Sequence, residues 1–359
     1  MNDKVKNYQS FLTTALRIIP LITLILFIGP VLAGLIGTIL PAFGYLPALG
    51  GNGFSLDPIR EMLLAPGIYN SIRLSFFTGL ATTIISLALV ILFCASWHGT
   101  WLFTKIQRFL SPLLSVPHVT IAFGLSFLLA PSGWFFRLTS PWATGFIRPP
   151  DIIITQDPFG ITLITALVVK EVPFLFLMTL AAINQINYVQ HLTVARSLGY
   201  GPIAAWLKTV FPKIYQQIRL PIFAVLAYAI SVVDVAIVIA PTTPPPLAVQ
   251  LLRWFNDPEI LMRFIASAGA ILQFMLVILA IGVWWTCEKI ITYFGKKWVF
   301  TGGRFTCDKW LRLIVALCLL LDLSSSKSIN AAVLKLYEKT DSLFALINNG
   351  AYGQAGALE

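Results

Sequence analysis

The feature that most constrains this chain is a series of long apolar runs with almost no charge. A helix needs about 20 apolar residues to cross the hydrocarbon core of a bilayer. Six runs reach that length, and each is bounded by charge, proline or glycine. The sequence therefore predicts an all-α, polytopic membrane bundle of six transmembrane helices, which are Ala15–Leu40, Ser71–Ser96, Phe109–Ala130, Gly160–Ile183, Ile218–Ala240 and Phe264–Trp285.

Composition supports a lipid environment for most of the chain. Of the 359 residues, 57% are hydrophobic and only 11% are charged, and the mean hydropathy is +0.83. Soluble proteins carry about 25% charged residues. The first apolar run exceeds the length of about 7–15 residues typical of a signal-peptide core and lacks a clear small-residue cleavage site, so we expect it to remain as a membrane helix.

The positive charges predict how the chain is oriented in the membrane. The formal net charge is +10, and Lys and Arg accumulate on the cytoplasmic side of membrane proteins. Fifteen of them fall on one side of the predicted helices and six on the other. This bias places the N-terminus, the 97–108 turn, the 184–217 loop and the segment from Thr286 in the cytoplasm. We therefore expect the bilayer, rather than nucleic acid, as the partner of this basic chain.

Three regions follow from these patterns. Residues 1–60 hold the first helix and a periplasmic loop, and residues 61–290 form the main transmembrane domain. Residues 291–359 contain a basic linker, a weak seventh apolar stretch at Leu313–Leu321 and a polar tail. Nine residues are too few to span a bilayer. The four cysteines show no metal-ligand spacing, so neither a metal nor a cofactor is expected.

The predicted cytoplasmic loop 187–212 carries the most specific pattern. Gly199 is the residue type that ends a helix in a left-handed conformation, and Pro202 suits the first turn of a new helix. Pro212 is expected to stop that second helix. The segment Ala204–Trp206 gives the second helix a compact apolar face with one large side chain. Such a face predicts docking onto a partner protein.

This loop resembles the EAA loop of ABC transporter permease subunits. Thr193-Val194-Ala195 takes the place of Glu-Ala-Ala, Gly199 that of the glycine, and Phe211-Pro212 that of Leu-Pro. Thr193 replaces the glutamate, so a salt bridge from that position is in doubt. The segment Asn-Ser-Ile-Arg-Leu-Ser at 70–75 also resembles binding-protein-dependent permeases. The likeness covers roughly residues 60–290 and is strongest to the iron(III)/thiamine/sulfate type, especially the Ynj-type permeases.

The resemblance implies the permease subunit of a bacterial ABC importer in the inner membrane. The helix near Gly201–Thr209 would then seat on a cytoplasmic ATPase dimer. Further implied partners are a second permease half or a second copy, and a periplasmic binding protein. Many Ynj-type permeases are two fused halves, so the stretch after Lys309 is expected to begin a second half. The implied coupling residues are Ala195, Gly199, Pro202, Ala205, Trp206 and Pro212.

The chain lacks the Gly-x-x-x-x-Gly-Lys-[Ser/Thr] phosphate loop. We therefore expect this subunit not to be an enzyme, and ATP hydrolysis to belong to a partner. A stiff external loop at Pro241–Pro246 and a short helix at Leu247–Phe255 are also expected. Contact with a binding protein and a plain connector remain equal interpretations of that loop.

Charged residues within the predicted spans suggest a second function. Lys170, Glu171 and Asp234 lie at membrane depth, where charge is costly and indicates a functional site. Adjacent helix residues do not face each other, so we expect Lys170 to pair with Asp234, and favour a structural pair over substrate contact. His118 after Pro117 is expected to be a satisfied polar residue at a kink. The alternatives are a secondary transporter or channel using these charges, or a scaffold without transport.

Overall fold

The computed structural model describes residues 2–140 and 142–300, and no strand occurs among them; a single bridge joins Leu46 and Gly51. The predicted stretch Leu313–Leu321 and the tail lie outside these residues. The all-α prediction is confirmed. The elements are α1 (Asn2–Ala42), η1 (Pro47–Leu49), α2 (Asp57–Leu64), α3 (Ile68–Trp97), α4 (Trp101–Leu113), α5 (His118–Leu129), α6 (Trp134–Thr139), α7 (Ile161–Ile183), α8 (Tyr188–Ser197), α9 (Pro202–Thr209), α10 (Phe211–Ser231), α11 (Asp234–Ile239), α12 (Leu247–Phe255) and α13 (Met262–Phe300).

Five stretches of the described chain are long and apolar enough to cross a membrane. They overlap five of the six predicted runs, the third only in part, and the predicted count of six is not confirmed. The run that is missing from them is Ile218–Ala240. The five are Ile18–Ala42, Ile68–Trp97, His118–Thr139, Ile161–Ile183 and Met262–Gly295.

The described residues divide into two compact units, residues 2–68 with 250–275, and residues 69–140 and 142–249 with 276–300. In the first unit, the apolar side chains of α1 between residues 16 and 39 are exposed, as expected of a helix solvated by lipid. The turn after α1 is tight, since a Cβ on Gly51 would lie 2.3 Å from the carbonyl oxygen of Gly44.

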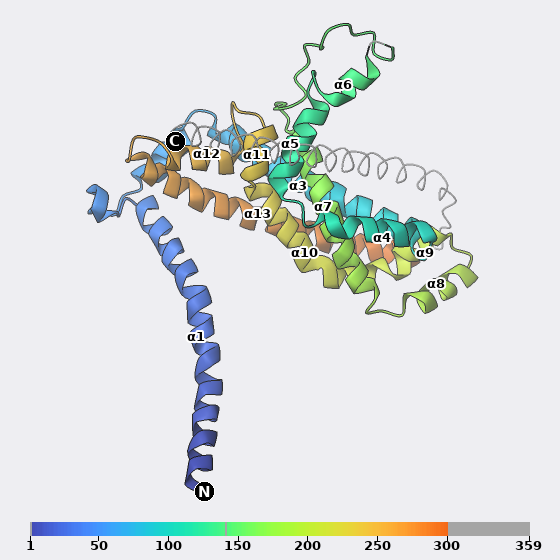
Figure 1. Cartoon of the computed structure of the whole chain (residues 1–359), viewed down its shortest axis with the longest axis horizontal. Helices are drawn as coiled ribbons and strands as arrows, with labels where there is room; N and C mark the ends of the chain where they lie inside the picture. The colour runs from blue at the N-terminus through green and yellow to red at the C-terminus, as the bar shows by residue number, and fades with distance from the viewer. Residues whose placement is uncertain (1, 141, 301–359) are drawn as a thin grey trace, which may run out of the picture. The chain divides into compact units, whose positions relative to one another are not determined.

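Helix α7 is the centre of the second unit. It packs against α4, α5, α10 and α11 (Figure 1). Its first turn is capped by Asp157, whose carboxylate accepts hydrogen bonds from the backbone N–H groups of Ile161 and Thr162 at 2.7 and 2.9 Å. A carboxylate at this end also interacts favourably with the helix dipole. The cap therefore fixes where α7 starts, and with it the depth of Lys170 and Glu171.

The C-terminal part of α13 is fastened to α10 by two polar contacts. The indole N–H of Trp284 donates to the Tyr215 hydroxyl at 3.1 Å. Arg219 Nε lies 3.0 Å from a carboxylate oxygen of Glu288. These contacts join α13 to the helix that follows the 187–212 loop.

Two of the predicted spans are broken rather than continuous. The run Phe109–Ala130 is divided into α4 and α5 at residues 114–117, where Pro117 cannot continue the hydrogen bonding of a helix. The run Ile218–Ala240 is divided into α10 and α11, with Val232 in an extended conformation. The prediction of one continuous helix is wrong in both places, because hydropathy measures length and apolar character and does not register backbone breaks.

The buried side chains of this unit form two apolar clusters. We call the first the α9 core; it contains Phe93 of α3, Ile106 of α4, Phe176 of α7, Trp206 of α9 and Ile218 of α10. The second, the α11 core, joins side chains of α5, the first half of α7 and α11, namely Ile121, Leu125, Leu167, Val235 and Ile239.

Candidate functional site

The 187–212 loop has the predicted order of helix, stop and second helix. Gly199 has φ +81° and follows the last turn of α8. The N–H of Gly199 donates to the carbonyl of Arg196 at 2.9 Å, and that of Tyr200 donates to the carbonyl of Ala195 at 3.3 Å. This pair of bonds is the Schellman motif, in which glycine takes the left-handed position. Pro202 occupies the first position of α9, as predicted.

The apolar face of α9 is buried. Ala204, Ala205 and Trp206 are 4%, 0% and 1% exposed, and the Trp206 ring belongs to the α9 core. The prediction that this face is free to dock onto a partner is therefore wrong. A short apolar helix next to a bundle buries its apolar area by packing against the bundle, and this burial does not require a partner.

Helix α8 is the exposed part of the loop. Val189, Val194 and Leu198 are 58%, 61% and 59% exposed, whereas Ala195 is buried. Helix α8 lies at the edge of the group formed by α4, α7, α9 and α10 (Figure 1). The exposed apolar surface of this loop is thus provided by α8 and its last turn, not by α9.

Two histidine contacts attach α8 to the rest of the unit. The ring of Tyr188, the first residue of α8, lies edge-on to His98 with 4.3 Å between ring centroids. Burial lowers the pKa of His98 below its ordinary value, which favours the neutral form of this ring. On the other side, His191 Nε2 lies 2.7 Å from Lys213 Nζ and accepts its hydrogen bond.

Other predicted loop residues have local roles. Thr193, which stands in the place of the family's glutamate, donates its hydroxyl hydrogen bond to the Val189 carbonyl at 2.9 Å within α8. Pro212 lies in the first turn of α10, where its missing N–H is tolerated. Pro212 was expected to stop the second helix, but α9 already ends at Thr209.

Lys170 does not pair with Asp234. Its side chain is buried, and its ammonium group donates to the carbonyls of Leu113, Leu114 and Val116 at 3.2, 3.1 and 2.6 Å. These carbonyls belong to the end of α4 and the break that follows it. The predicted ion pair is therefore wrong, because the break offers Lys170 three backbone carbonyl acceptors at the end of the neighbouring helix.

The remaining polar residues at this depth form a row of contacts. His118 Nε2 lies 3.8 Å from the Glu171 carboxylate, and the His118 and Tyr228 rings are 4.8 Å apart. The Tyr228 hydroxyl lies 3.5 Å from the carboxylate of Asp234. We call Glu171, His118, Tyr228 and Asp234 the polar row. Sequence reasoning missed Tyr228, although it lies six residues before Asp234 on the same predicted span.

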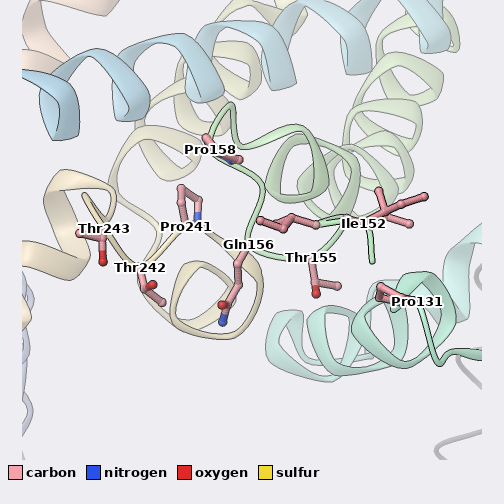
Figure 2. Close-up of a pocket in the computed structure, with 10 residues that line it drawn as sticks. Pro131, Ile152, Thr155, Gln156, Pro158, Pro241, Thr242 and Thr243 are labelled. Carbon is pink, nitrogen blue, oxygen red and sulfur yellow. The ribbon is translucent and has the colours of Figure 1, made fainter. Parts of the chain in front are cut away.

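A separate cavity of about 460 Å³ lies between the segment that leads into α7 and the proline-rich segment before α12. Figure 2 shows Pro131 and Ile152 on one side and Thr242 and Thr243 on the other. Gln156 adopts a left-handed backbone (φ +63°) and is held by a 3.0 Å hydrogen bond from its N–H to the Ile239 carbonyl. Within residues 2–140 and 142–300, no group of three metal-ligating side chains occurs here or elsewhere.

Comparison with known proteins places these features in a family context. No family model matches the chain. Over 205 residues, however, the chain is 29% identical to the inner membrane ABC transporter permease protein YnjC of Escherichia coli (strain K12). Over that stretch the chain is thus similar to an ABC transporter permease. The aligned stretch is 56% of this chain but 38% of YnjC, so the chain spans well under half of that relative.

A solved structure supports the same fold. The chain is similar to a chain in the crystal structure of a bacterial ABC transporter involved in the import of the acidic polysaccharide alginate, with a TM-score of 0.60 and 15% identity. The match covers 78% of this permease-like chain and 97% of the other. The predicted resemblance to ABC permeases and the multi-pass inner-membrane location are confirmed. The iron(III)/thiamine/sulfate type stays a prediction.

Proposed function

We propose that this chain is the transmembrane permease subunit of a bacterial ABC importer. In this function it forms part of the substrate pathway and transmits the conformational change of a cytoplasmic ATPase dimer. The single observation that carries the proposal is the construction of the 187–212 loop. A rigid two-helix loop on a permease-like fold presents one helix outward and anchors the other in the core.

The exposed helix α8 is the docking element of this proposal. Val194 and Leu198 supply apolar surface, and Arg196 beside them is also exposed. A short helix that lays its apolar side chains into a groove of a partner is a common recognition mode. The implied coupling residues on α9 then act by position, since Ala205 and Trp206 join α9 to the core.

The Schellman turn at Gly199 makes this arrangement stiff. Because α8 and α9 are joined by hydrogen-bonded backbone, a displacement of α8 is transmitted to α9. Trp206 then transmits it to the α9 core, which includes residues of α3, α4, α7 and α10. A mobile linker at Gly199 would instead absorb the displacement.

The exposure of one member of the polar row supports the proposal of a partner subunit within the membrane. Asp234 is exposed in the single chain, although it lies within a predicted span. A charged side chain at membrane depth faces protein or a water-filled cavity rather than lipid. We therefore propose that a second permease half, or a second copy of this chain, lies opposite Asp234. The cavity beside Thr242 is the corresponding site proposed for contact with a periplasmic binding protein.

The test is co-purification from the native host in mild detergent, followed by mass spectrometry and an ATPase assay. The wild-type chain is expected to retain an ATPase subunit in stoichiometric amount. The double variant Val194→Asp/Leu198→Asp is expected to lose it, because two charges interrupt the apolar surface of α8. Exposed positions tolerate such changes with little effect on folding.

The matched control is Gln185→Asp, which adds a carboxylate at an exposed position just before α8. It is expected to keep the ATPase. The proposal is contradicted if the wild-type chain retains no ATPase, or if the double variant and the control retain it equally. Thermal unfolding of all three proteins checks that any loss is not due to misfolding.

A further inference from the structure

Two adjacent residues of α7 contact the α4–α5 break at residues 114–117, where Leu114, Ser115 and Pro117 are exposed in the single chain and Val116 is half-buried. The last carbonyls of a helix have no partner within that helix. A backbone carbonyl without a donor is unfavourable wherever lipid or protein, and not water, surrounds it. The Val116 N–H supplies one local donor, to the Leu113 carbonyl at 3.3 Å, and further donors come from elsewhere in the structure.

Lys170 supplies those donors. An ammonium group has three N–H donors, and Lys170 directs hydrogen bonds to the three carbonyls of Leu113, Leu114 and Val116. Its side chain reaches them from α7, so the end of α4 is tied to the central helix. The buried positive charge is compensated in the same way, by the negative ends of the carbonyl dipoles.

Glu171 acts on the other side of the break. Consecutive residues of a helix point in different directions, and Glu171 lies 3.8 Å from Nε2 of His118, the first residue of α5. The end of α4 and the start of α5 are thus both held from neighbouring positions on α7. The break has a defined geometry because α7 contacts it on both sides.

This geometry decides where His118 lies. The centroids of the His118 and Tyr228 rings are 4.8 Å apart, and the Tyr228 hydroxyl lies 3.5 Å from the Asp234 carboxylate. If the break moved, His118 would lose its contacts with both Glu171 and Tyr228. The polar row therefore depends on a residue that is not part of it.

We propose that Lys170 is a positioning residue, which fixes the α4–α5 break through three backbone hydrogen bonds and thereby places His118 within the polar row. If the proposed function holds, Lys170 sets the geometry of the substrate pathway without touching the substrate. Its role then differs from that of Glu171 and Asp234, which offer carboxylates to the polar row itself.

The experiment compares Lys170→Met and Lys170→Arg in the full-length chain, reconstituted in lipid nanodiscs. Methionine has a similar length and no donor, whereas arginine keeps the charge and the donors. Hydrogen exchange is followed by mass spectrometry, and the histidine side chains are followed by NMR. The chain has only three histidines, so the His118 signal is assigned with His118→Gln.

In Lys170→Met, exchange of the amides of residues 114–121 is expected to rise about tenfold, while peptides from α3 and α10 change little, because local opening is separable from global unfolding. The His118 signal is expected to shift. Lys170→Arg is expected to restore both readouts towards wild type. The matched control is Thr179→Val, which removes a fully buried hydroxyl of α7 that has no hydrogen-bond partner among residues 2–140 and 142–300, and it is expected to change neither.

A uniform rise in exchange across the bundle, or an unchanged His118 signal in folded Lys170→Met, would overturn the proposal. If Lys170→Met does not fold, Lys170→Gln carries the same test. Its shorter amide cannot reach all three carbonyls, and the same local rise is expected. Neither readout requires an ATPase. If the co-purification experiment contradicts the proposed function, the role of Lys170 can therefore still be tested.

Discussion

The two short helices of the 187–212 loop are neighbours in sequence and similar in length, yet one is exposed and the other is buried. Helix α8 exposes Val189, Val194 and Leu198, whereas α9 contributes Ile203 and Trp206 to the α9 core. The difference shows that apolar character does not by itself identify a docking surface. In this loop, the more apolar helix α9 is packed into the core, and the less apolar helix α8 is exposed.

The largest effect is expected from Trp206→Ala. Removing a fully buried Trp from a core costs about 3–5 kcal/mol in the free energy of unfolding. The measurement is the temperature at which the detergent-solubilised protein loses its monodisperse peak in size-exclusion chromatography. A wild-type unfolding temperature in this variant would show that α9 is not anchored in the core.

A smaller effect is expected from Gly199→Ala. The left-handed backbone of Gly199 costs an L-amino acid with a Cβ about 1–2 kcal/mol. Gly199→Asn is the control, since asparagine tolerates this conformation better than alanine. Chemical denaturation of the three proteins should rank them wild type, Asn, Ala in decreasing stability, and equal values for all three would contradict the assigned turn.

The contact between His98 and α8 predicts a dependence on pH. The pKa of His98 is lowered by burial, so the unfolded chain takes up this proton at a higher pH than the folded chain does. The contribution of His98 to stability is therefore complete above its ordinary pKa of 6.5 and decreases as the pH falls below that value.

The measurement is the unfolding temperature of wild type and His98→Gln at pH 8 and at pH 5.5. The difference between the two proteins is expected to be more favourable to wild type at pH 8 than at pH 5.5. His118 and His191 are present in both proteins, so their titration largely cancels in the comparison. A difference that does not vary with pH would mean that His98 is not held in a neutral, buried state.

The smallest effect on stability is expected from Val194→Ser. Its side chain is 61% exposed, and exposed substitutions usually change the free energy of unfolding by no more than about 0.5 kcal/mol. Denaturation should therefore match wild type. A loss of more than about 1 kcal/mol would place Val194 in a packed environment and contradict the contrast between α8 and α9.

Much of the fold follows from the sequence because it depends on run length and on single residues with strong backbone preferences. The apolar runs locate the membrane helices, Gly199 and Pro202 locate the turn between α8 and α9, and Leu247–Phe255 was expected as the helix that α12 forms. These signals are local, and local signals can be interpreted without knowing what packs against them.

The site was less predictable because its geometry depends on contacts between distant segments. Lys170 bonds to carbonyls more than 50 residues earlier in the chain, and no property of the Lys170 region reveals them. Trp206 is equally suited to a core or to a partner's surface, and only the packing of α3, α4 and α7 around α9 decides between them.

The measurement that tests the central claim most directly is site-specific photo-crosslinking in the native host. The photoreactive residue p-benzoylphenylalanine is placed at Val194 in one protein and at Trp206 in another, and adducts are identified by mass spectrometry. We expect an adduct with an ATPase subunit from position 194 and none from position 206. An adduct from position 206 without one from position 194 would contradict the account, since α9 and not α8 would then be the docking helix.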